Sequence, residues 1–375
     1  MGDLQTNTRQ TGWMDTILIG TFAVLLWFPA ADNLLHLDHA LAFNEKRAPA
    51  AFPTLKPGTC GVQDYVKGLE VYFNDHFGWR KQLIHWHGQL EIAVFRKKTA
   101  NEVVWGTDGW LYYYPPKPGH DPPSRGPRLF SQQELENLRH ILECRRDWLA
   151  CRSINYLFVV APNKQSIYPE YLPSWLKLPS PTRLDQFLLY MSNHSTVAIL
   201  DLRPPLKRGK GLAPTYYRTD SHWNSFGGFI ASQEIVRALS CKMPGLRPVQ
   251  LEAFRMARSP MKRGDLADLL GICDDDEDMA LLPGPSLPKV EETVSDSGMV
   301  KPSFFSTNAA ASATAVVFRD SFGTALRQFM GYSFKSVSYV WTAKDFDAEV
   351  VEQLKPSVVV SEIAERNLDG LARWN

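Results

Sequence analysis

Two short segments, far apart in the chain, contain the residue types of a serine hydrolase site. The first holds Asp220 and His222, and the second holds Ser321. In extended chain, residues i and i+2 point to the same side, so Asp220 can lie beside His222, fix its tautomer and stabilise its imidazolium. His222 can then take the proton of a hydroxyl, for which Ser321 is the candidate. These types and spacings predict acyl transfer through a covalent intermediate.

The surroundings of Ser321 favour a nucleophile at a strand-to-helix turn. An apolar and β-branched stretch, 313–318, precedes it, and residues 323–326 read as a helix start. In that position the backbone N–H of Ser321 points, with the helix dipole, at a developing oxyanion. Taken singly, each segment also has a simpler explanation. An Asp-x-His pair is commonly a surface loop or half of a metal site, and Asp320-Ser321 is commonly a helix cap.

Further segments occur in an order that resembles the alginate O-acetyltransferase family, whose catalytic domain is related to the SGNH hydrolases. They are NEKR at 44–47, FP at 52–53, YFNDHFGWR at 72–80, VWGTDGWLY at 104–112, VAPNK at 160–164, YPE at 168–170, GDL at 264–266 and ERNL at 365–368. The resemblance covers roughly residues 44–370. It implies that Asp220, His222 and Ser321 are the catalytic triad. It also implies an SGNH hydrolase-like three-layer α/β sandwich with a mainly parallel sheet over residues 44–375.

The resemblance further implies a circularly permuted motif order, because ordinary SGNH hydrolases carry the serine first and the Asp-His element last. The oxyanion donors are then expected at the ends of the two strands after Ser321, near 339–342 and 361–362. Neither place has the expected Gly or Asn. The candidates are the Ser321 N–H, Ser361 and Asn163, and Asn163 is also a candidate cap of the turn that follows it. The chain ends soon after Arg366, so the carbohydrate-binding module of some relatives is not expected.

A transferase must favour a sugar hydroxyl over water, which requires that the acceptor be held in near-attack geometry. We therefore expect a groove across the carboxyl ends of the strands, with Ser321 at its floor. The candidates for its walls are Tyr216, Tyr217, Arg218 and Trp223. For Trp223, packing around the His222 turn is an equally good explanation.

Composition is consistent with a globular catalytic protein. The chain has 375 residues, of which 44% are hydrophobic, and a formal net charge of +1. Nothing therefore indicates nucleic-acid binding. Basic residues gather at 96–98 and at Arg203, Lys207, Arg208 and Lys210, either as a solvated loop or as a lip that holds an anionic polymer. The five cysteines show no metal-binding spacing and leave the redox compartment open. We expect neither a cofactor nor a metal.

The N-terminal region contains an uncharged apolar run, 16–31, between Asp15 and Asp32. As a helix it spans ~24 Å, less than the ~30 Å hydrocarbon core, but extension to 13–35 adds length. We predict an uncleaved membrane anchor at 13–35 after a tail at 1–12. A cleaved signal peptide, with a site near 40–42, and a buried core helix are the alternatives. The family resemblance places the protein in the bacterial inner membrane, with its catalytic domain facing the periplasm.

Alternating strand and helix patterns predict an α/β fold. Helices are expected at 64–73, 79–96, 131–151, 225–239, 324–330 and 346–354, and strands at 155–160, 197–200, 314–318, 336–340 and 357–361, with a hairpin at 102–114. Ser131 and Glu134 form a capping-box pattern. Residues 244–305 are polar and rich in Pro, Asp and Gly. Within them the acidic run 274–278 reads as a solvated loop, because it lacks the spacing of a calcium loop.

Together these observations predict an O-acetyltransferase that moves acetyl groups onto hydroxyls of an exopolysaccharide. The family implies a membrane-bound O-acyltransferase as the acetyl donor. Two alternatives remain: a polysaccharide acetyl esterase with the same triad, and a non-catalytic component of a polysaccharide export complex.

Overall fold

The computed structural model describes residues 13–35, 50–54, 59–76, 99–100, 102–114, 129–176, 178, 180–261, 264–272, 276–295, 303–307, 311–341 and 346–372. The chain divides into two compact units. One comprises residues 1–97 and 268–272, and the other comprises residues 98–267 and 273–375. The residues with a predicted catalytic role all belong to the second unit.

In the first unit, α1 (Trp13–Leu35) and α2 (Thr59–Asp75) are helical. Helix α1 coincides with the predicted anchor, and α2 contains the helix predicted at 64–73. Among the described residues, no helix combines the length and the apolar character needed to cross a membrane. The anchor therefore stays a prediction. The tail at 1–12, the cleavage site near 40–42 and the helix at 79–96 lie outside the described residues.

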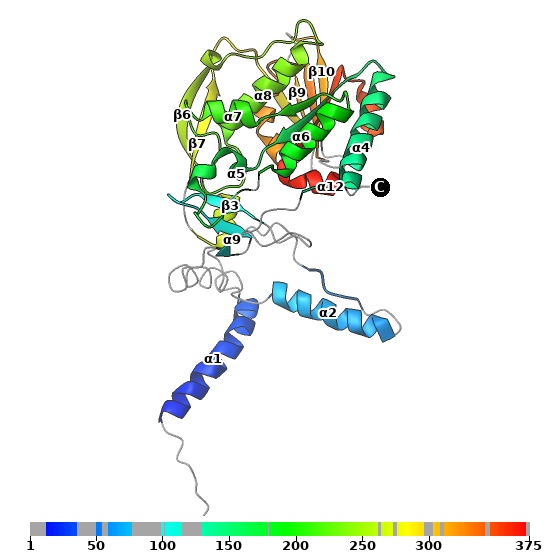
Figure 1. The fold of residues 1–375 in the computed structure, drawn as a ribbon. Coiled ribbons are helices and arrows are strands. Elements are labelled where there is room, and N and C mark those ends of the chain that lie inside the picture. The colour runs from blue at the N-terminus through cyan, green and yellow to red at the C-terminus, as the bar shows by residue number, and fades with distance from the viewer. Residues whose placement is uncertain are drawn as a thin grey trace, which may run out of the picture. The chain divides into compact units, whose positions relative to one another are not determined.

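A seven-stranded sheet organises the second unit (Figure 1). Its strands, in spatial order, are β5 (Ile199–Asp201), β4 (Asn155–Ala161), β12 (Val358–Ala364), β10 (Thr314–Arg319), β11 (Ser336–Trp341), β9 (Ser303–Thr307) and β8 (Glu291–Ser295). The pairs from β5 to β11 are parallel, and β9 and β8 add antiparallel strands at one edge. The mainly parallel sheet confirms the predicted α/β fold.

Helices cover both faces of this sheet, because its strands are apolar on both sides. Leu157 and Val159 of β4 face one core, whereas Tyr156 and Phe158 face the other. The first core includes residues of α7 (Arg203–Gly209), α8 (Ser225–Ser240) and α10 (Arg327–Met330), and the second includes residues of α4 (Gln132–Ala150), α6 (Arg183–His194), α11 (Ala348–Leu354) and α12 (Leu368–Ala372). Such burial on both faces is characteristic of parallel sheets.

Local signals in the sequence are confirmed where they lie close together in the chain. Ser131 and Glu134 form the expected capping box at the start of α4. The predicted hairpin consists of β2 (Val103–Trp105) and β3 (Leu111–Tyr113), which pair antiparallel, and β1 (Thr99–Ala100) pairs with β2. The turn between β2 and β3 contains Gly109 with φ +74°, a conformation that glycine adopts without strain.

The described parts of residues 244–305 contain several strands, although the polar sequence of this region had predicted none. After η2 (Leu251–Ala253), this region forms a long antiparallel hairpin from β6 (Phe254–Met261) and β7 (Asp276–Pro283), with α9 (Asp265–Leu270) between the two strands, and then β8 and β9. The acidic run is not simply solvated either, because Asp276 begins β7 and is buried. Charge obscured the strand pattern, since these carboxylates bind backbone and hydroxyl groups instead of water.

Candidate active site

Ser321 lies just after the end of β10, a strand that pairs in parallel with β11 on one side and β12 on the other. It is the first residue of the turn into η3 (Phe322–Thr324). Asp320 holds this turn. Its carboxylate accepts hydrogen bonds from the N–H groups of Phe322 (3.0 Å) and Ala364 (2.8 Å) and from Nδ2 of Asn367 (3.0 Å). The capping interpretation of the Asp-Ser pair thus fits Asp320, whereas the Ser321 side chain makes no capping bond.

Gly323, two residues after Ser321, leaves no room for a larger side chain. A Cβ on Gly323 would lie 2.5 Å from Cβ of Arg319 and 2.8 Å from Oε2 of Glu362. Glu362 is fully buried in β12 and accepts the Asp320 N–H at 3.1 Å. Burial, together with the negative charge of Asp320, raises the pKa of Glu362 well above its usual range. The serine turn is therefore packed against a buried carboxyl group whose surroundings favour its protonated form.

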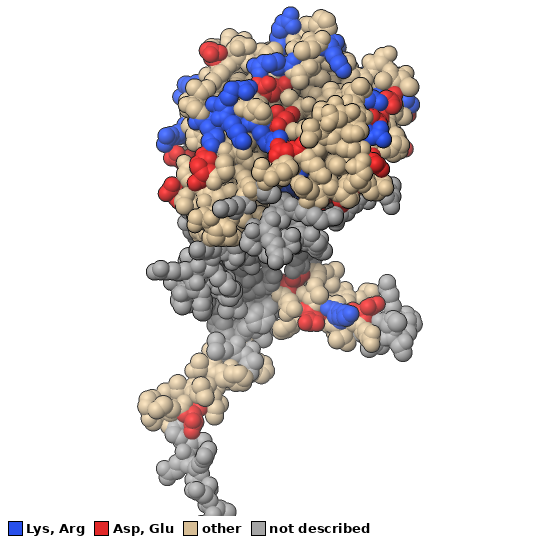
Figure 2. Space-filling view, in the orientation of Figure 1, with Lys and Arg blue, Asp and Glu red and all other residues tan. Residues whose placement is uncertain are grey.

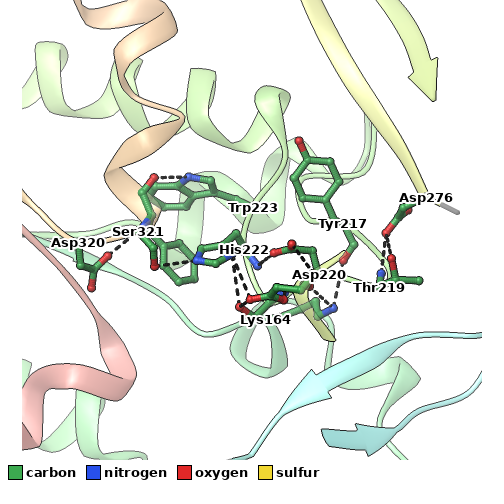
Figure 3. A network of polar contacts seen from close by, with 12 residues as sticks. Lys164, Tyr217, Thr219, Asp220, His222, Trp223, Asp276, Asp320 and Ser321 are labelled. Atoms are coloured by element: carbon green, nitrogen blue, oxygen red, sulfur yellow. Dashed lines mark hydrogen bonds and ion pairs between the residues drawn. The ribbon is translucent and has the colours of Figure 1, made fainter. Parts of the chain in front are cut away.

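The predicted contact between the two segments is present (Figure 3). Nδ1 of His222 lies 2.6 Å from Oδ1 of Asp220, and Nε2 of His222 lies 2.7 Å from Oγ of Ser321. The His222 N–H also donates to Asp220 Oδ1 at 2.9 Å. Asp220, His222 and Ser321 therefore form one continuous hydrogen-bonded row, in which Nε2 is free of the Asp220 contact and can accept the serine proton.

Asp220 is charged in this environment. Burial alone would raise its pKa, but the hydrogen bond and the charge of His222, with the backbone N–H groups of Asp265 and His222, hold the pKa well below its usual range. A permanent carboxylate at this position favours the imidazolium form of His222 during proton transfer.

Asp265 is a second carboxylate at the imidazole, and its sequence motif had suggested no role for it. Its N–H donates to Asp220 Oδ2 at 2.8 Å, and its carboxylate accepts from both N–H and Oγ of Ser221 at 2.7 Å. Oδ2 of Asp265 lies 3.7 Å from Nδ1 of His222. The preceding Gly264 allows this approach, because a Cβ there would collide with the backbone at Thr219 and Asp220.

A buried lysine fixes the loop that carries Asp220. Lys164, in α5 (Lys164–Ile167), donates from Nζ to the carbonyl oxygens of Tyr217 (3.1 Å), Arg218 (3.0 Å) and Asp220 (2.6 Å). Burial lowers the pKa of Lys164 to about 7, against the opposing attraction of nearby carboxylates. The three bonds use all three protons of an ammonium group and hold the backbone from Tyr217 to Asp220 in one conformation.

The acidic strand β7 holds the same loop from another side. Asp276 accepts the Thr219 N–H (2.6 Å) and hydroxyl (2.9 Å), and Asp278 accepts the Ser225 N–H (3.0 Å) and hydroxyl (2.6 Å). Sequence reasoning missed both roles. The alternation of Asp276 and Asp278 with period two was the available signal, since it places both carboxylates on one side of a strand.

The Asp220, His222 and Asp265 side chains could also form a metal-binding group, because one ligand atom from each lies within 4.8 Å of the others. The geometry favours hydrogen bonds instead. Nδ1 of His222 and Oδ1 of Asp220 are 2.6 Å apart, whereas two ligands of one zinc ion, each at ~2 Å in tetrahedral geometry, lie farther from each other.

A pocket of about 320 Å³ opens at the serine. Its lining residues are Tyr217, Asp220, His222, Trp223, Ser225, Ser321, Phe322, Thr324, Ala325 and Gln328. Two of the predicted wall residues, Tyr217 and Trp223, are among them. Trp223 is also packed as the alternative foresaw: it is buried, and its Nε1 donates to the Phe322 carbonyl at 2.9 Å.

The other two predicted wall residues do not line this pocket. Tyr216 is buried, and its hydroxyl donates to the carbonyl of Pro162 at 2.6 Å. Arg218 packs against the hairpin turn, where a Cβ on Gly109 would lie 2.6 Å from its Nη1. Of residues 216–218, therefore, only Tyr217 reaches the pocket.

The three predicted oxyanion donors differ in their position relative to the pocket. Ser361 does not fit the role, because it lies inside β12, paired with Phe158 and Phe318, and is buried on the face that carries Tyr156. Asn163 precedes α5 without a side-chain capping bond, and its N–H donates to Oε2 of Glu365 at 2.8 Å. It is absent from the pocket lining, so its role as a donor stays a prediction. Ser321 itself lines the pocket.

Comparison with known proteins gives a match over residues 103–321 to a family described as SGNH hydrolase-like domain, acetyltransferase AlgX. A probable alginate O-acetylase AlgJ of Pseudomonas syringae pv. tomato (strain ATCC BAA-871 / DC3000) is 28% identical over 212 residues, covering 55% of this chain and 50% of that protein. Its namesake in Pseudomonas fluorescens is 25% identical over 256 residues, covering 67% and 58%. The chain thus spans only about half the length of these relatives. Bacillus cereus PatB1 shares the fold, with a TM-score of 0.54 at 17% identity over 73% of this chain and 99% of that structure.

Proposed function

Because the chain belongs to the family of SGNH hydrolase-like acetyltransferase domains described by AlgX, we propose that it moves acetyl groups onto hydroxyls of an exopolysaccharide. The observation that carries this proposal is the hydrogen-bonded row from Asp220 through His222 to Ser321, which ends in a pocket. The names of the AlgJ relatives support an alginate-type polymer as the acceptor class.

In the proposed mechanism, His222 Nε2 takes the proton of Ser321 Oγ while Oγ attacks the carbonyl carbon of an acetyl donor. The tetrahedral oxyanion collapses, His222 returns its proton to the leaving group, and an acetyl-enzyme remains. A sugar hydroxyl then loses its proton to His222 and attacks the acetyl carbon. When this second intermediate collapses, the acetylated sugar leaves and Ser321 regains the proton.

The two carboxylates have different parts in this mechanism. Asp220 holds Nδ1–H of His222 and stabilises the imidazolium directly, through their 2.6 Å contact. Asp265 acts as a positioning residue, because it fixes Ser221 and the second oxygen of Asp220. Its charge, at 3.7 Å from Nδ1, adds to the stabilisation of the imidazolium.

We place the acetyl donor and the location of the reaction in the same proposal. The donor would be a membrane-bound O-acyltransferase, and the catalytic unit would face the periplasm with α1 as the segment that attaches to the cytoplasmic membrane. The position of Asp220 and His222 before Ser321 supports a circular permutation relative to ordinary SGNH hydrolases. Fractionation of cells tests the location: release of the full-length protein by salt alone would contradict attachment through α1.

Mass spectrometry of the protein incubated with an activated acetyl ester tests the reaction. An acetyl adduct on Ser321 is expected, and Ser321→Ala should abolish it, whereas alanine at the exposed Ser192 of α6 should leave it unchanged. Addition of uronate oligosaccharides should speed loss of the adduct and yield acetylated sugar. Loss as free acetate alone would establish the esterase alternative, and an adduct that persists in Ser321→Ala would remove Ser321 as the nucleophile. Absence of any adduct in the parent protein would favour a non-catalytic role.

A further inference from the structure

A second groove, of about 300 Å³, lies along α8 and is separate from the serine pocket. Its walls come from α7, α8 and the segment 248–252. The side chains that matter for binding are Arg208, Leu212, Phe226, Phe229, Gln233 and Glu252. The groove therefore combines an apolar floor with a few polar groups, the usual composition of a small-ligand site.

Gln233 is the most informative of these residues. It is only 7% exposed, and within the described part of the chain its Oε1 has no hydrogen-bond partner. An unmade hydrogen bond of a buried polar group costs about 1–3 kcal/mol, so native proteins rarely leave one without a reason. Because Oε1 itself is enclosed, a ligand hydroxyl in the groove would complete the bonding of this amide when the side chain turns toward the groove.

The charges of the groove suggest what else the ligand carries. Figure 2 shows Lys and Arg side chains gathered, with a few carboxylates between them, on the face that carries α7. Arg203 and Lys210 are held by ion pairs with Asp185 and Glu170. In the same cluster, Arg208 forms no ion pair with any described residue and lines the groove. Its planar guanidinium suits a carboxylate.

Carboxylates also line the groove, so the groove does not select for negative charge alone. Glu234 and Arg237 pair with each other on the groove wall, and Glu252 adds a carboxylate that can accept hydrogen bonds from hydroxyls. A sugar ring has an apolar C–H face and a rim of hydroxyls, which matches an apolar floor edged by an amide, a carboxylate and a guanidinium. A uronate unit adds the carboxylate that Arg208 can bind.

We propose that this groove is a second saccharide-binding subsite, which holds a uronate-containing polysaccharide at a distance from Ser321. The inference rests on the proposed function and adds where the polymer is held. Helix α8 connects the two places, because Ser225 in its first turn lines the serine pocket and Gln233 lines the groove. At ~1.5 Å per residue these two positions are ~12 Å apart along the helix.

A polymer bound at both places presents its hydroxyls to the acetyl-enzyme at a raised effective concentration, whereas a disaccharide in the serine pocket does not reach the groove. The expected signature is therefore a dependence on acceptor length. Variants of the groove should weaken the use of long acceptors and leave the chemistry at Ser321 unchanged.

The experiment uses the full chain and two groove variants, Arg208→Ala and Gln233→Leu. Arg258→Ala, on the exposed side of β6, is the matched control. Acetyl transfer is measured to a mannuronate disaccharide and to a long mannuronate oligomer, and hydrolysis of a small acetyl ester is measured alongside. We expect KM for the long oligomer to rise about tenfold in both groove variants. KM for the disaccharide and ester hydrolysis should stay unchanged, and the control should match the parent.

Equal KM values for the long oligomer in parent and groove variants would overturn the proposal. Calorimetry measures the affinity of the parent, Arg208→Ala and Arg258→Ala proteins for the long oligomer, and it tests the subsite independently of catalysis. If no acceptor is acetylated, the proposed function fails, yet a loss of oligomer binding confined to Arg208→Ala would still support the subsite. Failure of the parent to bind the oligomer would overturn it.

Discussion

Replacement of Asp265 by Asn removes a charge from the imidazole without a change in side-chain size. Oδ2 of Asp265 is 3.7 Å from Nδ1 of His222, and the two side chains are 18% and 22% exposed. At that distance, two unit charges interact by about 1 kcal/mol in water and about 4 kcal/mol at an effective dielectric constant of ~20. We therefore expect Asp265→Asn to lower kcat by about 5-fold to about 1,000-fold, because the imidazolium forms only during the reaction.

Asp278→Asn is the matched control for this substitution. Asp278 accepts the N–H and hydroxyl of Ser225 just as Asp265 accepts those of Ser221, so both variants loosen the loop in the same way. Of Asp265 and Asp278, only Asp265 lies near Nδ1 of His222. The Asp278 variant should lose stability but keep the shape of its pH–rate profile.

Steady-state hydrolysis of an activated acetyl ester from pH 5 to pH 9 provides the measurement. Besides Asp265, the charged groups around His222 are Asp220, Lys164 and Arg366, which lies 5.0 Å from the Phe322 ring that packs on the imidazole. The substitution removes one negative charge, and it also lowers the pKa of Lys164 further, because Asp265 is one of the carboxylates whose attraction raises that pKa. Both changes should move the acid limb of the profile to lower pH. A kcat within twofold of the parent, with an unmoved acid limb, would refute an electrostatic role for Asp265.

Two further predictions concern the serine turn. Glu362→Gln should fold normally, because an amide oxygen can still accept the Asp320 N–H. The pKa of Glu362 is higher in the folded than in the unfolded state, so its contribution to stability is complete below the unfolded-state pKa near 4.5 and is lost as pH rises toward the folded-state pKa. Between pH 5 and pH 8, thermal melts should therefore show a larger loss of stability in the parent than in the variant. Equal losses in the two proteins would contradict a buried protonated carboxyl group at this position. Gly323→Ala should lower the free energy of unfolding by about 1–3 kcal/mol in urea titrations and reduce activity, because the methyl group would meet Arg319 Cβ at 2.5 Å. Gly211→Ala, whose methyl would meet nothing nearer than 3.4 Å, is its control, and equal stability of the two variants would argue against close packing at the turn.

Features encoded within a few residues were predictable from the sequence. The Asp220–His222 contact follows from their i, i+2 spacing, and the capping box of α4 from Ser131 and Glu134. The strands of the parallel sheet were predictable from their composition, because a strand that is buried on both faces consists mostly of apolar residues. The pairing with Ser321 came from a combination of hydroxyl, turn and motif order.

Contacts that depend on distant segments were not predictable. Asp265, Asp276 and Lys164 bind the loop that carries Asp220 and His222 from separate parts of the chain, and a single charged residue in a sequence does not indicate such a partner. The strand β7 was hidden because its acidic residues resemble a solvated run until the loop that they bind is known. Ser361 was misplaced for a similar reason, since the end of β12 is set by its pairing with β4 up to Ala364.

His222 and Ser321, the two side chains that we propose to react, are carried by two segments of the second unit that different contacts hold in place. Asp220 and His222 sit on a loop fixed by Lys164, Asp265 and β7, whereas Ser321 sits on a turn fixed by β12. The bond from Trp223 to the Phe322 carbonyl crosses between them, as does the close packing of α8 on the serine turn, where a Cβ on Gly228 would lie 2.5 Å from that of Ala325. In the proposed mechanism, the distance that the proton travels from Ser321 to His222 therefore depends on how closely α8 packs on the serine turn. Larger side chains at Gly228 or Ala325 would move His222 away from Ser321 without a change to either residue. If the two act as we propose, such substitutions would alter the rate of acyl transfer and leave its chemistry the same.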